Sequence, residues 1–539
     1  MHAFCGVPGL EGEIKITPET LPKLTPPKAE KGGYMREELR PYADEAFGIV
    51  ETAANDIGPR LPGSDNERKF ADHMADKLKA IGITPVKEKF LVAPRASIGG
   101  IPYAGWAGIV AAVLMLFPAV SFSTSGVSGL FIGLHGLAFF ICLATLVWLV
   151  CSVFLYKTWF DFAFKQEVSQ NVYGEVLPAD GKYDYTIMLS AHTDTSWNWK
   201  HSAATRFMPG GPVSAFVKMG IGVVAFLFIF ACSAAMFFSE LDLVTKFGLS
   251  ALMSDSMENM TEDELMRIIE LAAGLSDLSV ALYILIPLFV IPGCFLITLW
   301  ADKNPRTASP GAMDNATGIG IAYAATKYFK ENPDKLPAGC RIIDFNCGSE
   351  EAGLRGSIAF TRRHKGEDIL KNCWNINIDS IADKDHFQVV HGDTWQFTRF
   401  DADLERMLAE AMRDAGIENP GNIANPVGGC DSTPFTKAGV KSITFAAQNP
   451  ILTHYYHTFY DQPERFEKET VGLGLDVVLR LVDKIAAFRA GSAPVQESAA
   501  PVEAAPAEEA PVEAEVISAP ADAEFVEAEV VAEDVPEKE

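Results

Sequence analysis

Four long stretches without charged residues constrain this chain more than any other feature of its sequence. Each has the roughly 20 apolar residues that a helix needs to cross a bilayer core of about 30 Å. The alternative is a set of buried core helices, but globular helices of this length that are apolar on every face are uncommon. We therefore predict four transmembrane helices, at residues 101–121, 127–156, 219–238 and 278–300. His135 lies in the second stretch, and we assign it no role.

The four stretches pair into two hairpins. The first pair is joined by the short link 122–126, and the second by the longer, acidic segment 239–277. Within that segment, Thr261 and Glu264 form a capping-box pattern that predicts a helix start. We expect this helix to be a separate lid over the second hairpin.

Both hairpins interrupt a longer domain, as inserts at 97–165 and 201–305. The remainder alternates short β-branched runs with amphipathic stretches, which is typical of an α/β domain with a largely parallel sheet flanked by helices. We assign this discontinuous domain to residues 41–96, 166–200 and 306–490. Strands are expected at 186–191, 341–347, 375–379, 387–390 and 442–447, and helices at 66–82, 315–331, 402–415 and 468–489.

Charge is concentrated away from the apolar stretches. The chain has 45 basic and 70 acidic residues, a net charge of −25, yet its mean hydropathy is +0.12. The last 49 residues (491–539) are rich in Ala, Pro, Val and Glu and predict a disordered acidic tail. Residues 1–40 predict a flexible segment without a signal-peptide pattern. The acidic balance argues against nucleic acid as a partner.

Polar clusters follow the predicted strands, where the loops of α/β sheets commonly form sites. The segments are AHTD (191–194), GAMDNATG (311–318), GSEEAGLRGS (348–357), NIDS (377–380) and YYHTFYD (455–461). Zinc accepts imidazole and carboxylate ligands. Two imidazoles and three carboxylates give two metal ions three protein ligands each if one carboxylate bridges; they are His192, Asp314, Glu351, Asp379 and His457.

Two further carboxylates have supporting roles in this scheme. Asp194 is placed to orient the His192 ring. In the Glu350–Glu351 pair, one member can bind metal while the other acts as a general base on a water activated by the metals.

The nine cysteines include no CxxC pair, so neither a disulfide framework nor a cysteine zinc site is indicated.

Together these motifs resemble the co-catalytic zinc aminopeptidase family. That family includes bacterial leucyl aminopeptidases, glutamate carboxypeptidases, and glutaminyl cyclases and transferrin receptors as non-peptidase relatives. The resemblance also covers the opening segment IGPRLPGSDNERKFADHMADKL (57–78). It implies two Zn²⁺ per chain, with peptides as substrates.

The resemblance also assigns roles residue by residue. It makes Asp314 the bridging ligand, places His192 and Asp379 on one metal and Glu351 and His457 on the other, and makes Glu350 the base. Asp431, in GGCDSTPF, matches the family's Ser-Asp-His segment, but Ser432 stands where His is usual, and its role stays open. The membrane inserts are departures from the family pattern.

An aminopeptidase is our leading hypothesis among several. Glutaminyl cyclases use one zinc and usually replace the Asn after the bridging Asp, whereas Asn315 is retained here. A dead receptor or scaffold with a peptidase fold loses ligands, whereas all five are present. A transporter is disfavoured because no predicted span carries a central acidic or basic residue.

The charged flanks of the hairpins predict topology. The side opposite the peptidase has only Lys246 and Arg267 among many acids, and Lys and Arg favour the cytoplasmic face. We therefore expect a multi-pass protein of the plasma membrane, with its catalytic domain held against the bilayer on the cytoplasmic side; protein partners stay unknown. The basic flanks on the peptidase side are Lys87, Lys89, Arg95, Lys157, Lys165, Lys200, Arg206, Lys218, Lys303 and Arg306.

Overall fold

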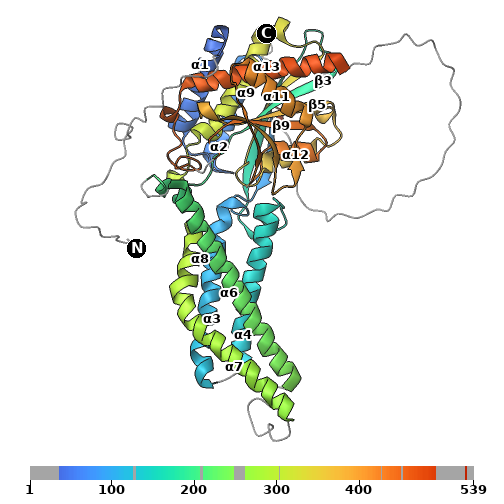
Figure 1. Cartoon of the computed structure of the whole chain (residues 1–539). Coiled ribbons are helices and arrows are strands. Elements are labelled where there is room, and N and C mark those ends of the chain that lie inside the picture. Colours follow the sequence, from blue (N-terminus) through green and yellow to red (C-terminus); the bar gives the residue numbers. More distant parts are fainter. Residues whose placement is uncertain are drawn as a thin grey trace, which may run out of the picture.

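The computed structural model describes most of the chain and places it in two regions, an α/β domain and a helical bundle (Figure 1). Residues 491–539 lie outside the described part except 491–492, which end a helix, and 529–530. Of residues 1–40, only 35–40 are described, and they begin the first helix. The described residues are 35–125, 129–206, 211–247, 261–302, 304–426, 428–450, 453–492 and 529–530.

The α/β domain is built on one mixed sheet with the strand order β10-β1-β2-β4-β3-β5-β9-β6-β7, and β8 pairs with β6. The central pairs β4–β3, β3–β5 and β5–β9 are parallel, and β1–β2, β2–β4 and β6–β9 are antiparallel. The predicted mixed sheet flanked by helices is therefore confirmed, but it is less parallel than expected, since most pairs outside its centre are antiparallel. The strands are β1 (Val86–Val92), β2 (Glu167–Val176), β3 (Tyr185–His192), β4 (Cys340–Cys347), β5 (Cys373–Ile381), β6 (Phe387–Asp393), β7 (Thr398–Arg399), β8 (Gly421–Asn425), β9 (Lys441–Ala447) and β10 (Glu529–Val530).

Helices cover both faces of the sheet because alternate strand residues point to opposite sides. In β3, Ile187 and Leu189 pack into the larger core with α1, α2, α9, α11 and α13, whereas Met188 packs with Phe360 and Phe435 on the other face. The four predicted helices are confirmed as α2, α9, α11 and α13. The helices of this domain are α1 (Arg40–Glu51), α2 (Asp65–Ala80), α5 (Lys200–Ala204), α9 (Thr317–Glu331), α10 (Arg355–Arg363), α11 (Ala402–Asp414), α12 (Ser432–Lys437) and α13 (Lys468–Ser492).

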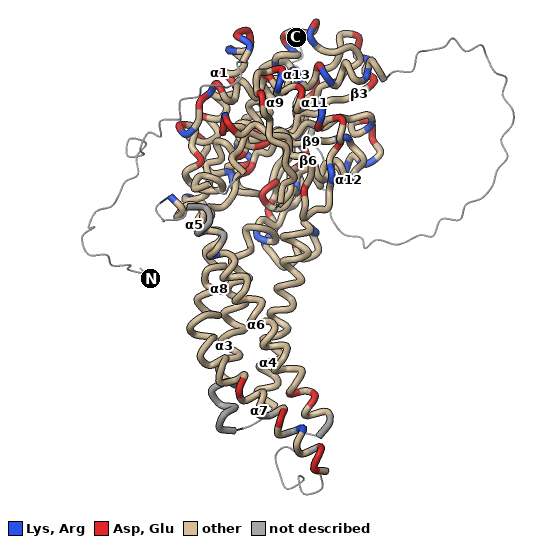
Figure 2. Tube along the Cα trace, in the orientation of Figure 1, with Lys and Arg blue, Asp and Glu red and all other residues tan. Residues whose placement is uncertain are grey.

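The bundle contains four helical segments long and apolar enough to cross a membrane. Small residues such as Ala111, Ala112 and Ala225 pack inside it, while large apolar side chains such as Val113 face outward. Its middle is almost free of charge, and charged residues gather at its two ends (Figure 2). The helices are α3 (Ile101–Ser125), α4 (Gly129–Trp148), α6 (Gly211–Phe247), α7 (Glu262–Leu285) and α8 (Ile291–Thr298), with π-type turns at Leu149–Phe154 and Ile286–Val290.

Two expectations about the second hairpin were wrong. The capping box does not open a separate lid: α7 starts at Glu262 and runs on to Leu285 into the fourth apolar stretch, because no proline or cap interrupts it before Pro287. In addition, the third span extends past Phe238 and includes Glu240, an acid in a membrane-type helix. A buried contact joins it to the first hairpin: His135 Nδ1 lies 2.7 Å from Glu240 Oε2.

Both hairpins leave the α/β domain at the same edge of the sheet. Val92, which ends β1, pairs with Glu167, which starts β2, and the first hairpin connects them. Val172 of β2 pairs with Asn346 near the end of β4, so this connection lies at the carboxyl edge of the parallel strands. The second hairpin follows His192, which ends β3 at that same edge.

Candidate metal centre

The five predicted ligands converge at the carboxyl edge of the sheet. They form two groups of possible metal ligands, His192–Asp314–Asp379 and Asp314–Glu351–His457, with the donor atoms of each group within 4.8 Å of one another. His192 Nε2 lies 3.0 Å from Asp314 Oδ1 and 3.8 Å from an oxygen of Asp379. His457 Nε2 lies 2.9 Å from Asp314 Oδ2 and 3.2 Å from Glu351 Oε1. Asp314 thus faces both groups, with a different oxygen toward each.

Asn315 fixes the loop that carries Asp314. Its Nδ2 donates to the carbonyl of Ile378, 2.9 Å away, and its Oδ1 accepts from the backbone N–H groups of Gly318 and Ser380. This side chain therefore connects the start of α9 to β5, the strand that supplies Asp379. The peptide bond between Asp314 and Asn315 is cis.

Two buried carboxylates outside the ligand groups hold the Glu350–Glu351 loop. Asp194 accepts the backbone N–H of Glu350 at 2.9 Å and that of Glu351 at 3.0 Å. Nδ1 of His192 lies 3.4 Å from Oδ1 of Asp194 and 3.2 Å from its backbone carbonyl, so Asp194 contacts the ring while anchoring the loop; its predicted orienting role stays a prediction. Glu67 accepts from Ser349 N at 2.7 Å, as well as from Gly63 N and two hydroxyls. Sequence reasoning missed Glu67, although it lies in the opening segment quoted above.

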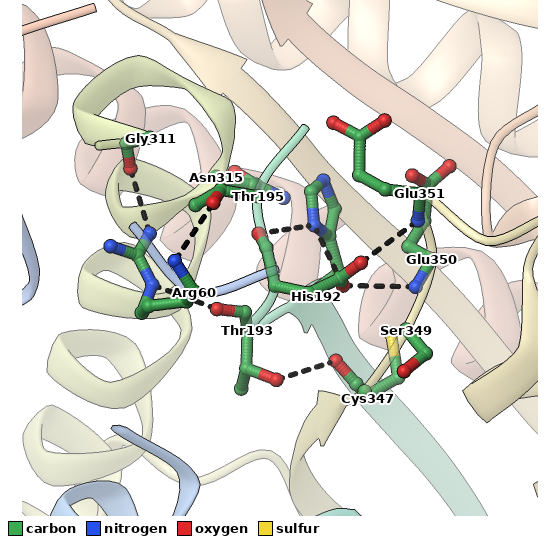
Figure 3. A network of polar contacts seen from close by, with 12 residues as sticks. Arg60, His192, Thr193, Thr195, Gly311, Asn315, Cys347, Ser349, Glu350 and Glu351 are labelled. Atoms are coloured by element: carbon green, nitrogen blue, oxygen red, sulfur yellow. Dashed lines mark hydrogen bonds and ion pairs between the residues drawn. The ribbon is translucent and has the colours of Figure 1, made fainter. Parts of the chain in front are cut away.

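Arg60 is a second residue that sequence reasoning missed. Its buried guanidinium donates to the carbonyls of Thr193, Pro310 and Gly311 at 2.7–2.9 Å (Figure 3). It therefore connects the loop after β3 to the loop that carries Asp314. At Gly311, with φ of +63°, a Cβ would lie 2.2 Å from Thr195, so only glycine fits there. The arginine in IGPRLPG was the only sequence signal for this connection.

Acidic groups outnumber basic ones in the site, and the pKa values of its carboxyl and imidazole groups are shifted as a result. Burial raises the pKa of Glu351 to about 8, and Asp314 acts in the same direction. Burial also raises the pKa of Glu350 well above its usual value, with Glu351 adding to the effect. Burial alone lowers the pKa of His192, but hydrogen bonds to Asp194, Asp314 and Asp379 outweigh it and raise that pKa. Such a site favours bound cations.

Asp431 lies behind the centre and not among the ligands. It is fully buried, and one of its oxygens lies 2.8 Å from the thiol of Cys347 while the other accepts the hydroxyl of Ser357. It thus connects the end of β4 to α10. Ser432, in place of the usual His, accepts the hydroxyl of Thr444 at 2.8 Å. Both residues support the walls of the site.

Each membrane hairpin places an aromatic side chain against the centre. Trp199, two residues before the second insert, donates its backbone N–H to the carbonyl of His457 at 2.8 Å, and the two rings meet edge to face at 4.4 Å. Tyr156, just past the first hairpin, is buried with a φ of +52°. Its ring fills a slot beside Gly353 and Gly429, where an added Cβ would lie 3.2 Å and 2.9 Å from it.

Comparison with known proteins covers part of this chain. Residues 300–482 match the family described as Peptidase family M28. Over 203 residues the chain is 25% identical to aminopeptidase YwaD of Bacillus subtilis (strain 168), covering 35% of this chain and 41% of that protein. The chain therefore spans about two fifths of the length of this curated relative.

Solved structures with a similar chain path include enzymes of more than one activity. A zinc aminopeptidase from Bacillus subtilis has 15% identity and a TM-score of 0.43, covering 82% of this chain and 94% of its own. A Bacteroides thetaiotaomicron glutaminyl cyclase bound to N-acetylhistamine has 13% identity and a TM-score of 0.43, covering 82% and 97%. At these values the similarity does not discriminate between the two activities.

The matched segment supplies most of the centre described above. It contains Asp314, the Glu350–Glu351 pair, Asp379 and His457, while His192 lies before it on β3. The family resemblance expected from the motifs is thereby supported: residues 300–482 of this chain match Peptidase family M28.

Proposed function

We propose that this chain is a membrane-bound zinc aminopeptidase that removes N-terminal residues from peptides. The observation that carries the proposal is the pair of ligand groups sharing Asp314, with Glu350 beside them and in neither group. This arrangement separates metal binding from proton transfer, as hydrolysis by an activated water requires. The match of residues 300–482 to a peptidase family supports the same reaction class.

The donor set fits two zinc ions. Five donors are too many for one tetrahedral ion, and imidazoles with carboxylates are ligands that zinc accepts. Glu351 Oε1 is buried without a hydrogen-bond partner among the described residues, so a cation or water can still satisfy it. His192 and Asp379 serve one ion, Glu351 and His457 the other, and Asp314 both.

Glu350 acts as the general base. Zinc, when bound, polarises the scissile carbonyl and makes water more acidic. Because burial raises the pKa of Glu350, this carboxylate can take a proton from the attacking water and later give it to the leaving amine. Asp194 accepts the backbone N–H of Glu350, which fixes the position of the backbone from which the Glu350 side chain extends.

Tyr456 is placed to assist at the carbonyl oxygen. Its ring stacks on His457 with centroids 3.8 Å apart. Burial raises the pKa of Tyr456 well above its usual value, and Asp314 adds to this effect, so the phenol stays protonated. A protonated phenol beside the centre can donate a hydrogen bond where negative charge develops.

The bilayer surface is the proposed working place of this enzyme. Both hairpins leave from the sheet edge that carries the metal centre, so insertion of the bundle holds the centre close to the membrane. Basic residues where the bundle joins the catalytic domain, among them Lys157 and Lys200, favour placement of that domain at the cytoplasmic face of the plasma membrane. The proposed substrates are peptides whose N-termini are presented at that surface.

A substrate panel tests the reaction. The full-length protein in detergent is assayed for bound metals and for cleavage of aminoacyl, N-acetylated and N-terminal glutaminyl peptides. We expect two zinc ions per chain, release of free amino acids, and no cleavage of acetylated peptides. Loss of ammonia from N-terminal glutamine without peptide cleavage would instead identify a cyclase, and cleavage confined to N-acetylated peptides would identify another exopeptidase branch.

Cysteine labelling in intact cells tests the orientation. A cysteine replacing Glu262, exposed at the far end of the bundle, should react with an impermeant thiol reagent. A cysteine replacing Asp180, exposed on the catalytic domain, should react only after lysis. The reverse pattern would place the active site outside the cell.

A further inference from the structure

A basic groove lies where the first hairpin returns to the catalytic domain. It has a volume of about 260 Å³ and is formed by Leu155–Lys157, α10 and α12 together with Leu354 and Gln396. Four of its lining residues are cationic and none is acidic; the cations are Lys157, Arg362, Lys365 and Lys437. The metal centre does not use this groove.

The cations of the groove take part in no ion pair within the described part of the chain, although Asp161 and Asp393 interact with Arg362 and Lys437 from farther away. Among the described residues, no carboxylate oxygen lies within ion-pair distance of any of the four, whereas lysines elsewhere, such as Lys468 with Asp44, are paired. Lys437 donates only to the amide oxygen of Gln396, at 3.0 Å. Burial and the nearby Lys157 lower the pKa of Lys437, and Asp393 opposes this only in part, so the two ammonium groups repel each other. An anion between them relieves this repulsion.

The position of the groove indicates which anion reaches it. The second candidate span ends at Phe154, one residue before the groove begins, and Gln396 donates to the Phe154 carbonyl. Three aromatic side chains around this point are largely exposed: Trp159 (65%), Phe162 (81%) and Phe397 (88%). Exposed aromatic residues beside a span are typical of the headgroup level of a bilayer.

We propose that this groove binds the anionic headgroup of a membrane phospholipid. This inference rests on the membrane insertion proposed above, but not on the peptidase reaction. The headgroup phosphate lies between the lysines, and the acyl chains pass along the outer side of the first hairpin. Tyr156 and Leu354 line the groove and also pack against the loops near Glu350, at Gly353 and Gly429. The bound lipid therefore also holds these loops of the active site in place.

Lipid binding can be measured without turnover. The full-length protein in neutral detergent is titrated with phosphatidylglycerol, phosphatidylcholine or inorganic phosphate, and bound molecules are counted by native mass spectrometry. The test variant is Lys157→Gln/Lys365→Gln/Lys437→Gln. The matched control is Lys182→Gln/Lys330→Gln/Lys371→Gln, which removes the same charge from exposed lysines at the opposite edge of the sheet.

The expected result is saturable binding of phosphatidylglycerol but not phosphatidylcholine, weakened about a hundredfold in the groove variant and unchanged in the control. The estimate follows from a factor of about five for each cation near an anionic lipid surface. Equal weakening in both variants, or none in either, overturns the proposal. Binding of inorganic phosphate as tight as that of the lipid also overturns it, in favour of a soluble anion.

Glu350→Gln separates this proposal from the proposed function. The variant should lose peptidase activity and still bind phosphatidylglycerol like the unmodified chain. If lipid binding fails while the peptidase works, only the groove proposal is wrong. If the protein is not found in the membrane fraction of cells, the membrane part of the proposed function fails with it.

Discussion

The molecule buries histidine against carboxylate both in the candidate metal centre and in the helical bundle. In the centre, His192 and His457 share Asp314 at 3.0 Å and 2.9 Å, and further carboxylates surround them. In the bundle, His135 meets Glu240 at 2.7 Å, with both side chains at most 1% exposed. The same two chemical groups thus form a crowded acidic cluster in one region and an isolated pair in the other.

The difference between the two places lies in donor number and access. Asp379 in the centre is 20% exposed on its side chain, so substrate can approach it. Among the described residues, no third metal-binding side chain joins His135 and Glu240. A single pair on two helices from different hairpins is suited to linking the hairpins, and a cluster of five donors is suited to holding metal. Four measurements can break or sharpen this contrast.

The largest effect is expected for a ligand of the centre. His457→Ala should abolish measurable activity and lower the zinc content by at least one ion per chain, because it removes the only imidazole of its group. Metal analysis beside a peptide assay measures both quantities. A His457→Ala protein that is fully active and keeps all its zinc would show that this cluster is not the metal site, and the contrast with the bundle would be wrong.

Glu350→Gln should lower kcat by a factor of about 10²–10⁴ while both metals stay bound, because only proton transfer is removed. Glu351→Gln is the matched control, since it changes the adjacent carboxylate and should weaken metal binding. Kinetics and metal content of the two variants are measured together. Reversed phenotypes would mean that the roles of the two glutamates are exchanged.

His135→Ala should destabilise the bundle by about 3–5 kcal/mol, the usual cost of leaving one partner of a buried pair alone. The double variant His135→Leu/Glu240→Leu should recover most of this loss, since a well-packed apolar pair is often as stable. Thermal denaturation in detergent measures both. A fall in zinc content of His135→Ala would mean that the bundle also holds metal, and the contrast would fail.

Asp344 gives a third case, a buried acid without histidine or metal. Burial raises its pKa to about 7, and its Oδ2 has no hydrogen-bond partner. The folded protein therefore binds a proton that the unfolded chain has released, and stability falls as pH rises from about 4 to 7. Asp344→Asn should remove this penalty and raise Tm by roughly 5 °C at pH 8.

The same substitution should change Tm little at pH 4.5, where the acid is largely protonated in the folded chain. Asp334→Asn, which changes an exposed aspartate, is the control and should show no such dependence. An Asp344→Asn protein whose Tm gain is equal at both pH values would show that Asp344 is not a titrating penalty.

Part of the candidate centre was predictable because two of its proposed ligands, His192 and Asp379, lie at the ends of strands. In a parallel sheet these ends meet at one edge, so His192 and Asp379 had to lie near each other once the strands were identified. Arg60 and Glu67 escaped prediction for the opposite reason. Many of their partners are backbone groups of distant loops, which leave no side-chain pattern in the sequence.

The bundle was predictable in number of spans but not in its internal contacts. Apolar composition marks a span without fixing how the helix is rotated, so no pattern paired His135 with Glu240. Counting the third stretch only to Phe238 also left Glu240 outside it, although the helix continues to Phe247. The continuity of α7 was missed because a good N-terminal cap predicts where a helix starts and not how far it extends.

If the chain is the membrane peptidase proposed above, the shared exit of both hairpins at the edge of the candidate metal centre determines how it meets its substrates. An enzyme and a peptide that are both bound to one membrane meet by diffusing in two dimensions. Their effective concentration is therefore the number of molecules per lipid and not the number per volume of solution. Adding lipid at constant amounts of enzyme and substrate should then slow the reaction, although bulk concentrations do not change. Selection among peptides becomes a matter of where their N-termini lie, so a weakly selective pocket can still serve a narrow set of substrates.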